Sequence, residues 1–162
     1  MHSANHVSPD HLLDLANAVE LSKEEGRVAW ERAYEELHAK LSALGQDGTL
    51  YVVFGLQGGG KTTWIQLNAS KFGPHAVFLE GPLPSSRHRE RALAIAKAIG
   101  CRCVAVWVDT PYDVALARNA GRPGLSRIRE ETMLHVFHAL EPPSLAEGFA
   151  EILHVTSAER DA

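Results

Sequence analysis

The residues best suited to chemistry form a glycine-rich loop at positions 55–62, which reads Gly-Leu-Gln-Gly-Gly-Gly-Lys-Thr. This loop satisfies the phosphate-binding pattern G-x-x-x-x-G-K-[ST] at every fixed position. Glycines allow successive backbone N–H groups to turn toward an anion. In such a loop, Lys61 is expected to reach the β- and γ-phosphates of a nucleotide, and the Thr62 hydroxyl to hold Mg²⁺. The pattern therefore predicts a nucleotide-binding site.

The segments on either side of the loop support this interpretation over an incidental glycine-rich turn. Residues 50–54 are β-branched, aromatic or leucine, which is typical of a buried strand. Residues 63–69 contain neither Gly nor Pro and are expected to open a helix, whose N-terminus adds free N–H donors and partial positive charge. The residues expected to bind the nucleotide here are Gly55, Gln57, Gly58, Gly59, Gly60, Lys61, Thr62 and Thr63.

Length and composition indicate one globular domain with an appendage. The chain has 162 residues, of which 45% are hydrophobic and 22% charged. Its apolar runs are too short to span a bilayer, and its start does not resemble a secretory signal, so we expect a cytoplasmic protein without a membrane partner. Cys101 and Cys103 are expected to be buried thiols rather than part of a metal site or a disulfide framework. The formal net charge of −4 argues mildly against a nucleic-acid-coated protein and still allows a local basic groove.

The N-terminal third is predicted to be a helical hairpin, residues 1–47, in front of a nucleotide-binding core, residues 48–162. Residues 1–7 are expected to form a tail, and Ser8-Pro9-Asp10 to start the first helix. Ser22, with Glu25 three residues on, is a capping box that opens the second helix. This hairpin could cover the sheet, supply groups that bind an acceptor, or mediate oligomerisation.

Beyond residue 48, strand and helix signals alternate, which predicts an α/β fold with a mainly parallel sheet and helices on its faces. The further strands are expected at 76–80, 103–108 and 152–155. The further helices are expected at 87–99, from Thr110 with Thr110 as N-cap, and at 126–140.

Four arginines and two carboxylates are additional candidates for chemistry. Arg118, Arg122, Arg127 and Arg129 flank a Gly/Pro-rich break, as in an arginine-bearing lid, although a solvated basic face would have the same pattern. Glu80 ends a predicted strand, where ligands bind in open α/β sheets, so it could hold Mg²⁺ or accept a proton. Asp109 has a similar position but could simply cap the following helix. The basic run 87–91 at a helix start indicates an anionic partner or, more simply, a solvated surface.

From the loop onward, the order of motifs is G-x-x-x-x-G-K-T-T, V-F-L-E-G, R-H-R-E-R-A, V-D-T-P, A-R-N-A-G-R and E-P-P-S-L-A-E-G-F. Over residues 50–156 this resembles the P-loop kinases of the polynucleotide 5′-hydroxyl kinase type. The resemblance implies a P-loop NTPase three-layer α/β fold. It also implies that Arg122 is the lid arginine acting on the transferred phosphoryl group, that Arg118 lies near the base, and that Glu80 replaces the family's metal-site aspartate. Arg87 matches the arginine that heads the next helix, and Glu147 looks structural.

The chain departs from this family in one interval. Between the loop helix and the strand at 76–80, family members usually have another strand and then the aspartate that takes the acceptor's proton. Residues 66–75 are too few for this and contain no aspartate. Glu80 is the nearest substitute, and Asp10, Asp14, Glu24 and Glu25 of the predicted hairpin are more distant candidates. The hairpin is hypothesised to occupy the missing segment's space.

These features predict an ATP-dependent kinase that uses Mg²⁺ and acts on a hydroxyl group, with Lys61, Arg122 and Glu80 as its catalytic residues and Thr62 and Glu80 as its metal ligands. The acceptor is either a nucleic-acid 5′ end or a small molecule, and the nucleotide is ATP or GTP. The alternative is a nucleotide-binding module or weak ATPase that works as a switch. The oligomeric state is left open.

Overall fold

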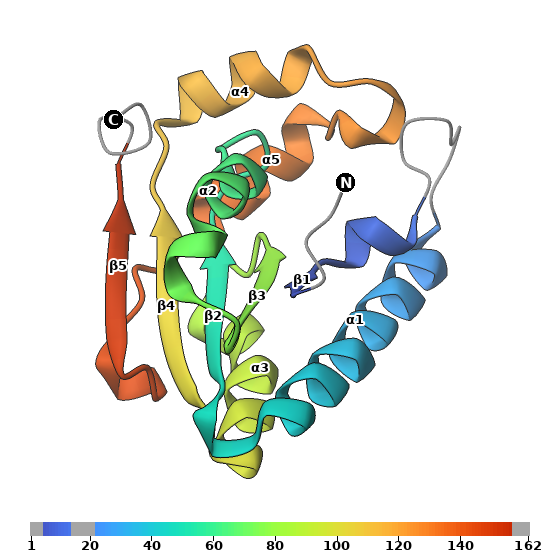
Figure 1. Cartoon of the computed structure of the whole chain (residues 1–162). Helices are drawn as coiled ribbons and strands as arrows, with labels where there is room; N and C mark the ends of the chain where they lie inside the picture. The colour runs from blue at the N-terminus through green and yellow to red at the C-terminus, as the bar shows by residue number, and fades with distance from the viewer. Residues whose placement is uncertain (1–4, 14–21, 157–162) are drawn as a thin grey trace.

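The computed structural model describes residues 5–13 and 22–156, which form an α/β fold around an all-parallel sheet with strand order β1-β3-β2-β4-β5 (Figure 1). This confirms the predicted α/β class and its mainly parallel sheet. The central strand, β2, is the one that leads into the glycine-rich loop, so the loop emerges at the middle of the sheet's carboxyl edge. The strands are β1 His6–Val7, β2 Thr49–Phe54, β3 Ala76–Gly81, β4 Arg102–Val108 and β5 Glu151–Val155.

Helices cover both faces of the sheet and make three layers. α1 (Lys23–Leu44) and α3 (Ser86–Ile99) lie on one face, and α2 (Lys61–Asn68) lies on the other. α4 (Tyr112–Ala120) and α5 (Glu130–Ala139) lie beyond the carboxyl ends of the strands (Figure 1). The short 3-10 turns are η1 Pro9–Leu12, η2 Gly45–Asp47, η3 Ala69–Phe72, η4 Gly124–Ser126 and η5 Leu145–Glu147.

The sheet is apolar on both sides because each face packs against a helix layer. Along β2, Leu50, Val52 and Phe54 point into the core shared with α1 and α3. The alternate residues Tyr51 and Val53 point into the core shared with α2. Burying a side chain of this size contributes roughly 1.5–3 kcal/mol, so this strand firmly anchors the loop that follows it.

The N-terminal segment differs from the predicted tail and hairpin. Residues 5–7 are not a tail: His6 and Val7 form β1, which pairs in parallel with Phe78 and Leu79 of β3 and is 3% and 0% exposed at these two residues. Ser8 does accept a hydrogen bond from the Asp10 N–H, but the turn that follows is the 3-10 turn η1. The rest of the predicted first helix lies outside the described residues.

The second predicted helix is confirmed as α1, including its capping box between Ser22 and Glu25. α1 does not stand apart from the core. Its buried residues Ala33, Leu37 and Leu41 belong to the same hydrophobic cluster as those of α3 and the sheet. The N-terminal segment thus contributes both an edge strand and part of one helix layer.

Two predicted helix starts are wrong. The helix expected from 126 begins at Glu130, after the separate turn η4. Thr110 does not cap the helix after it, because α4 follows Pro111 without a side-chain cap. The Thr110 hydroxyl instead donates to the carbonyl of Gly59, at 2.6 Å, and so braces the glycine-rich loop. Cys101 and Cys103 are free and buried, as predicted. In the part of the chain that the structure describes, every helix is too short or too polar to cross a membrane.

Candidate functional site

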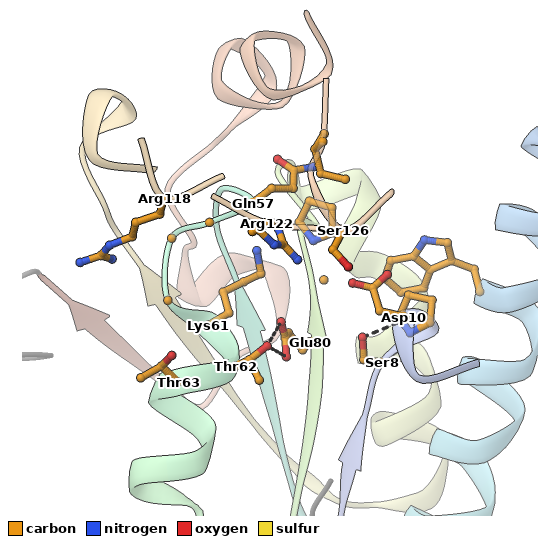
Figure 2. A pocket seen from close by; sticks show the side chains of 18 residues that line it. Ser8, Asp10, Gln57, Lys61, Thr62, Thr63, Glu80, Arg118, Arg122 and Ser126 are labelled. Carbon is orange, nitrogen blue, oxygen red and sulfur yellow. Dashed lines mark hydrogen bonds between the residues drawn. The ribbon is translucent and has the colours of Figure 1, made fainter. Parts of the chain in front are cut away.

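A cavity of about 630 Å³ opens at the carboxyl ends of β1, β2 and β3. Its walls come from the glycine-rich loop, the start of α2, the end of β3, the turn η1, Trp30 of α1 and the segment that joins α4 to α5. The volume lies within the range of about 300–1,000 Å³ typical of small-molecule sites. Figure 2 shows Lys61, Thr62, Glu80, Arg122, Asp10 and Ser126 around this one space.

The loop needs glycine at two positions where its shape is set. Gly58 has φ +75°, and a Cβ there would lie 2.6 Å from the carbonyl oxygen of Ala115. Gly60 has φ +99° and is the residue from which α2 begins. Both conformations are strained for residues with a side chain. The loop therefore turns tightly into the N-terminus of α2, where backbone N–H groups without helical partners favour an anion.

Lys61 is buried at the centre of the loop. Its Nζ donates to the carbonyl oxygens of Gly55 and Leu56, at 2.9 Å each. Burial lowers the pKa of Lys61 to about 8, although the nearby carboxylates of Glu80 and Asp10 act in the opposite direction. The pKa of Lys61 is therefore close to neutral pH, and an added anion would favour the charged form of this side chain.

Glu80 is held between two hydrogen-bond donors. The Thr62 hydroxyl donates to both of its carboxylate oxygens, at 2.9 and 2.8 Å, and His6 Nε2 lies 2.8 Å from Oε1. Burial acts to raise the pKa of Glu80, but the hydrogen bond from His6, the charge of Lys61 and the hydrogen bond from Thr62 together hold it below its ordinary value. The Glu80 carboxylate thus lies directly beside the Thr62 hydroxyl.

These two oxygen-bearing groups suit Mg²⁺. Mg²⁺ prefers oxygen ligands and is commonly bound through one or two carboxylates together with substrate phosphates and water. Among the described residues, no group of three or more His, Cys, Asp or Glu side chains is arranged to hold a metal. Thr62 and Glu80 could supply two of the oxygen ligands of such an ion.

The four arginines of the predicted lid separate into two pairs. Arg118 and Arg122 line the main cavity, whereas Arg127 and Arg129 line a second cavity of about 500 Å³. Arg122 lies beside Lys61, while Arg118 extends away from it toward the opposite side of the site (Figure 2). Asn119 holds the segment that joins α4 to α5 in place. Its side-chain amide donates a hydrogen bond to the carbonyl of Ile128 and accepts one from the N–H of Ile128.

Asp10, which the sequence offered only as a more distant substitute for the missing aspartate, also lines the cavity. It follows β1 and opens on the cavity, on the side opposite Arg118 (Figure 2). Burial and the negative charge of Glu80 raise the pKa of Asp10. The positive charges of Lys61 and Arg122 lower it in part. Its place could not be read from local sequence, since the pairing of β1 with β3 brings it there.

Gln57 and Thr63 of the predicted nucleotide-binding set also line the cavity. The Gln57 side-chain oxygen is buried and has no hydrogen-bond partner within the described chain. Such a group is available to a ligand donor, because buried acceptors are normally satisfied.

Other candidates lie outside the cavity. Asp109 forms a hydrogen bond with the His154 ring, with 2.8 Å between Oδ2 and Nε2, at the carboxyl ends of β4 and β5. Arg87, at the head of α3, is exposed.

Its neighbour Arg89 is fully buried instead. Arg89 pairs with Glu147 through two contacts of 2.8 and 3.1 Å and lies over the ring of Phe54. Arg91 pairs with Glu31 of α1. Two arginines of the basic run, Arg89 and Arg91, therefore find their anionic partners within the chain, and Glu147 has the structural role expected of it.

No protein-family model matches the chain, and a search of curated proteins found no match above the significance threshold. The assignment of function therefore depends on the residues of this cavity and their geometry.

Proposed function

We propose that this protein is an ATP- and Mg²⁺-dependent phosphotransferase that moves the γ-phosphate of ATP to a hydroxyl group. The observation that carries the proposal is the convergence, in one cavity, of the glycine-rich loop, the buried Lys61, the Thr62–Glu80 pair and Arg122. A loop of this sequence and shape, at the start of a helix, fits a chain of phosphates.

Each group has a distinct part in the proposed reaction. The loop N–H groups and Lys61 bind the β- and γ-phosphates, and phosphate charge holds Lys61 protonated. Arg122 stabilises charge on the γ-phosphoryl group as it leaves ADP. Thr62 and Glu80 hold Mg²⁺, which when bound neutralises phosphate charge. Arg118, which also lines the cavity, would lie near the base of the nucleotide, as the resemblance to the polynucleotide kinases implies.

A second candidate function is a nucleotide-binding switch or weak ATPase. It is favoured by the absence of an aspartate from residues 66–75, where related kinases usually have their proton acceptor. Lys61 and Thr62 also already bond to protein groups, which would keep the loop ordered without chemistry. We prefer phosphotransfer because a binding module has little use for an arginine beside Lys61.

The test is to incubate the protein with Mg²⁺ and γ-labelled ATP in the presence of hydroxyl compounds, with Lys61→Ala and Arg122→Ala in parallel. Arg127→Ala, which changes the second cavity alone, is the matched control. We expect label on an acceptor with the wild type and the control, and its loss with the other two variants. Label that appears only as free phosphate, or stays on ATP that is demonstrably bound, would favour the switch.

A further inference from the structure

The acceptor end of the cavity is built by a segment from the start of the chain. β1 pairs with β3 in parallel, so the residues that follow Val7 lie alongside those that follow Leu79. Ser8 is thereby set beside Glu80, and its hydroxyl fixes the turn by accepting the Asp10 N–H at 3.2 Å. Ligands bind at the carboxyl ends of strands in sheets of this kind. The β1–η1 segment therefore ends inside the site.

The other wall of this end is apolar and closely packed. Trp30 of α1 lies against Gly81 so tightly that a Cβ on Gly81 would be 2.5 Å from the indole. Tyr34 stacks behind Trp30, with ring centroids 5.5 Å apart. Trp30, Gly81 and Pro82 all line the cavity. The acceptor end thus has a fixed, largely apolar wall that faces the single carboxylate of Asp10.

Charge is divided sharply across the cavity. Its three described cations are Lys61, Arg118 and Arg122, all on the loop and lid side. The acceptor end, made of Ser8, Pro9, Asp10, Trp30, Gly81 and Pro82, has none. The first 22 residues of the sequence contain no lysine or arginine at all.

Two of the arginines on the flanking helices α1 and α3 are already paired with carboxylates of the chain. Arg27 pairs with Glu24, and Arg91 pairs with Glu31. A polynucleotide acceptor needs protein cations along its phosphates. The Asp10 carboxylate would instead repel those phosphates.

We propose that the β1–η1 segment and Trp30 form the acceptor site, that this site takes a small uncharged hydroxyl compound rather than a nucleic acid, and that Asp10 accepts the hydroxyl proton. This inference rests on the proposed phosphotransferase function. In the step, the acceptor oxygen bonds to the γ-phosphorus as the bond from that phosphorus to the β,γ-bridging oxygen breaks. ADP leaves with the electron pair. The acceptor proton passes to the Asp10 carboxylate and then to solvent.

Asp10 is suited to this part because it lines the cavity and its burial raises its pKa above the ordinary aspartate value, which makes its carboxylate a better proton acceptor than that of an exposed aspartate. Glu80 is less suited, since two hydrogen bonds already occupy its carboxylate and hold its pKa low. The two carboxylates thus have separate tasks, one toward the metal and the other toward the acceptor.

The test measures transfer from γ-labelled ATP to two sets of probes. One set is uncharged, namely adenosine, thymidine, glycerol and glucose. The other is charged, namely short 5′-hydroxyl oligodeoxythymidylate and oligoadenylate RNA. Asp10→Asn and Asp10→Glu are compared with wild type, and Asp47→Asn, at the opposite end of the sheet, is the matched control. ATP binding is measured separately by calorimetry.

We expect transfer to an uncharged probe and none to the oligonucleotides. Asp10→Asn should lower kcat for this transfer by about 10²–10⁴-fold, the usual contribution of a positioned base, with ATP affinity unchanged. It should also abolish the acid limb of the pH profile, which Asp10→Glu should restore in part. A merely structural role for Asp10 would leave the shape of that profile unaltered.

The possible failures are distinguishable. If wild type transfers to an uncharged probe and Asp10→Asn transfers equally fast, the role of Asp10 is wrong while phosphotransfer stands. If only oligonucleotides accept label, the acceptor class is wrong. If wild type binds ATP and transfers to no probe, the acceptor assignment is wrong; if the γ-phosphate never leaves ATP, the phosphotransferase function fails as well.

Discussion

The two ends of the cavity are built in opposite ways. Most of the phosphate end comes from one continuous stretch, β2, the loop and α2, in which neighbours in sequence are neighbours in space, and Glu80, Arg118 and Arg122 are added to it from β3 and from α4 and the segment that follows α4. The acceptor end is assembled from β1, β3 and α1, which are distant in sequence and meet only through sheet pairing and helix packing. The phosphate end is positively charged and the acceptor end negatively charged. Under the proposed function, such a cavity can keep its phosphate-binding end while its acceptor specificity is rebuilt from another part of the chain.

The largest effect should come from removing Arg122 at the phosphate end. We predict that Arg122→Ala lowers the single-turnover rate of phosphoryl transfer by about 10³–10⁵-fold, the typical contribution of an arginine that acts on a transferred phosphoryl group. The affinity for ATP should change far less, because charge on the γ-phosphoryl group develops during transfer. A loss of ATP binding as large as the loss of rate would show that Arg122 only binds substrate.

His6 links the two ends, because it comes from β1 and contacts the Glu80 carboxylate at 2.8 Å. We predict that His6→Leu raises the Mg²⁺ concentration needed for half-maximal nucleotide binding by about 10–100-fold, as is usual when a group that orients a ligand is lost. His6→Gln, which keeps an N–H donor, should recover most of this. An unchanged Mg²⁺ requirement in His6→Leu would show that His6 of β1 has no part in holding the metal ion.

The phosphate end should also respond to pH through Lys61. Because burial lowers its pKa to about 8, the protein without nucleotide loses this charge as the pH rises through that value. We predict that kcat/KM for ATP falls about tenfold per pH unit above about pH 8. Lys61→Arg should move this limb to higher pH, whatever its effect on the maximal rate. A profile that stays flat to pH 10 would contradict the assignment.

The smallest effect concerns stability at the acceptor end. Burial raises the pKa of Asp10, so between the unfolded and folded pKa values the folded state binds more protons than the unfolded state. The free energy of unfolding therefore falls as the pH rises through this interval. We predict that Asp10→Asn slightly raises Tm at pH 7 and has no such effect well below the aspartate pKa. A lower Tm at pH 7 would mean that the ionised Asp10 stabilises the fold.

The same contrast explains what the sequence could reveal. The strand, loop and helix around Lys61 were predictable because periodicity, glycine spacing and helix start all lie within twenty or so residues. β1 could not be predicted in this way, because a strand of two residues is too short to show a periodic hydrophobic pattern. Its stability comes from covering the edge of β3, where Phe78 N–H also donates to the Asn5 carbonyl at 2.8 Å. Consequently, the sequence alone gave no reason to place Asp10 nearer to the glycine-rich loop than the other carboxylates of the N-terminal segment.

Arg89 illustrates a second limit. The sequence places several basic residues at the head of α3, and the resemblance selects Arg87. Which of them faces inward depends on where the helix begins, at Ser86, and on the arrival of Glu147 from the far end of the chain. Only the packed structure determines this. Likewise, local rules favour Thr110 as a cap, but the carbonyl of Gly59 is its partner.

The fate of the γ-phosphorus tests the central claim most directly. ³¹P NMR of the protein with ATP, Mg²⁺ and an uncharged hydroxyl compound follows that atom without separating products. We predict that the γ-phosphate signal declines while a phosphomonoester signal and those of ADP grow in equal amounts, and that the phosphomonoester is lost in Asp10→Asn and Arg122→Ala. An ATP spectrum that stays unchanged, or that yields only inorganic phosphate, would contradict the claim that this cavity joins a nucleotide site to an acceptor site.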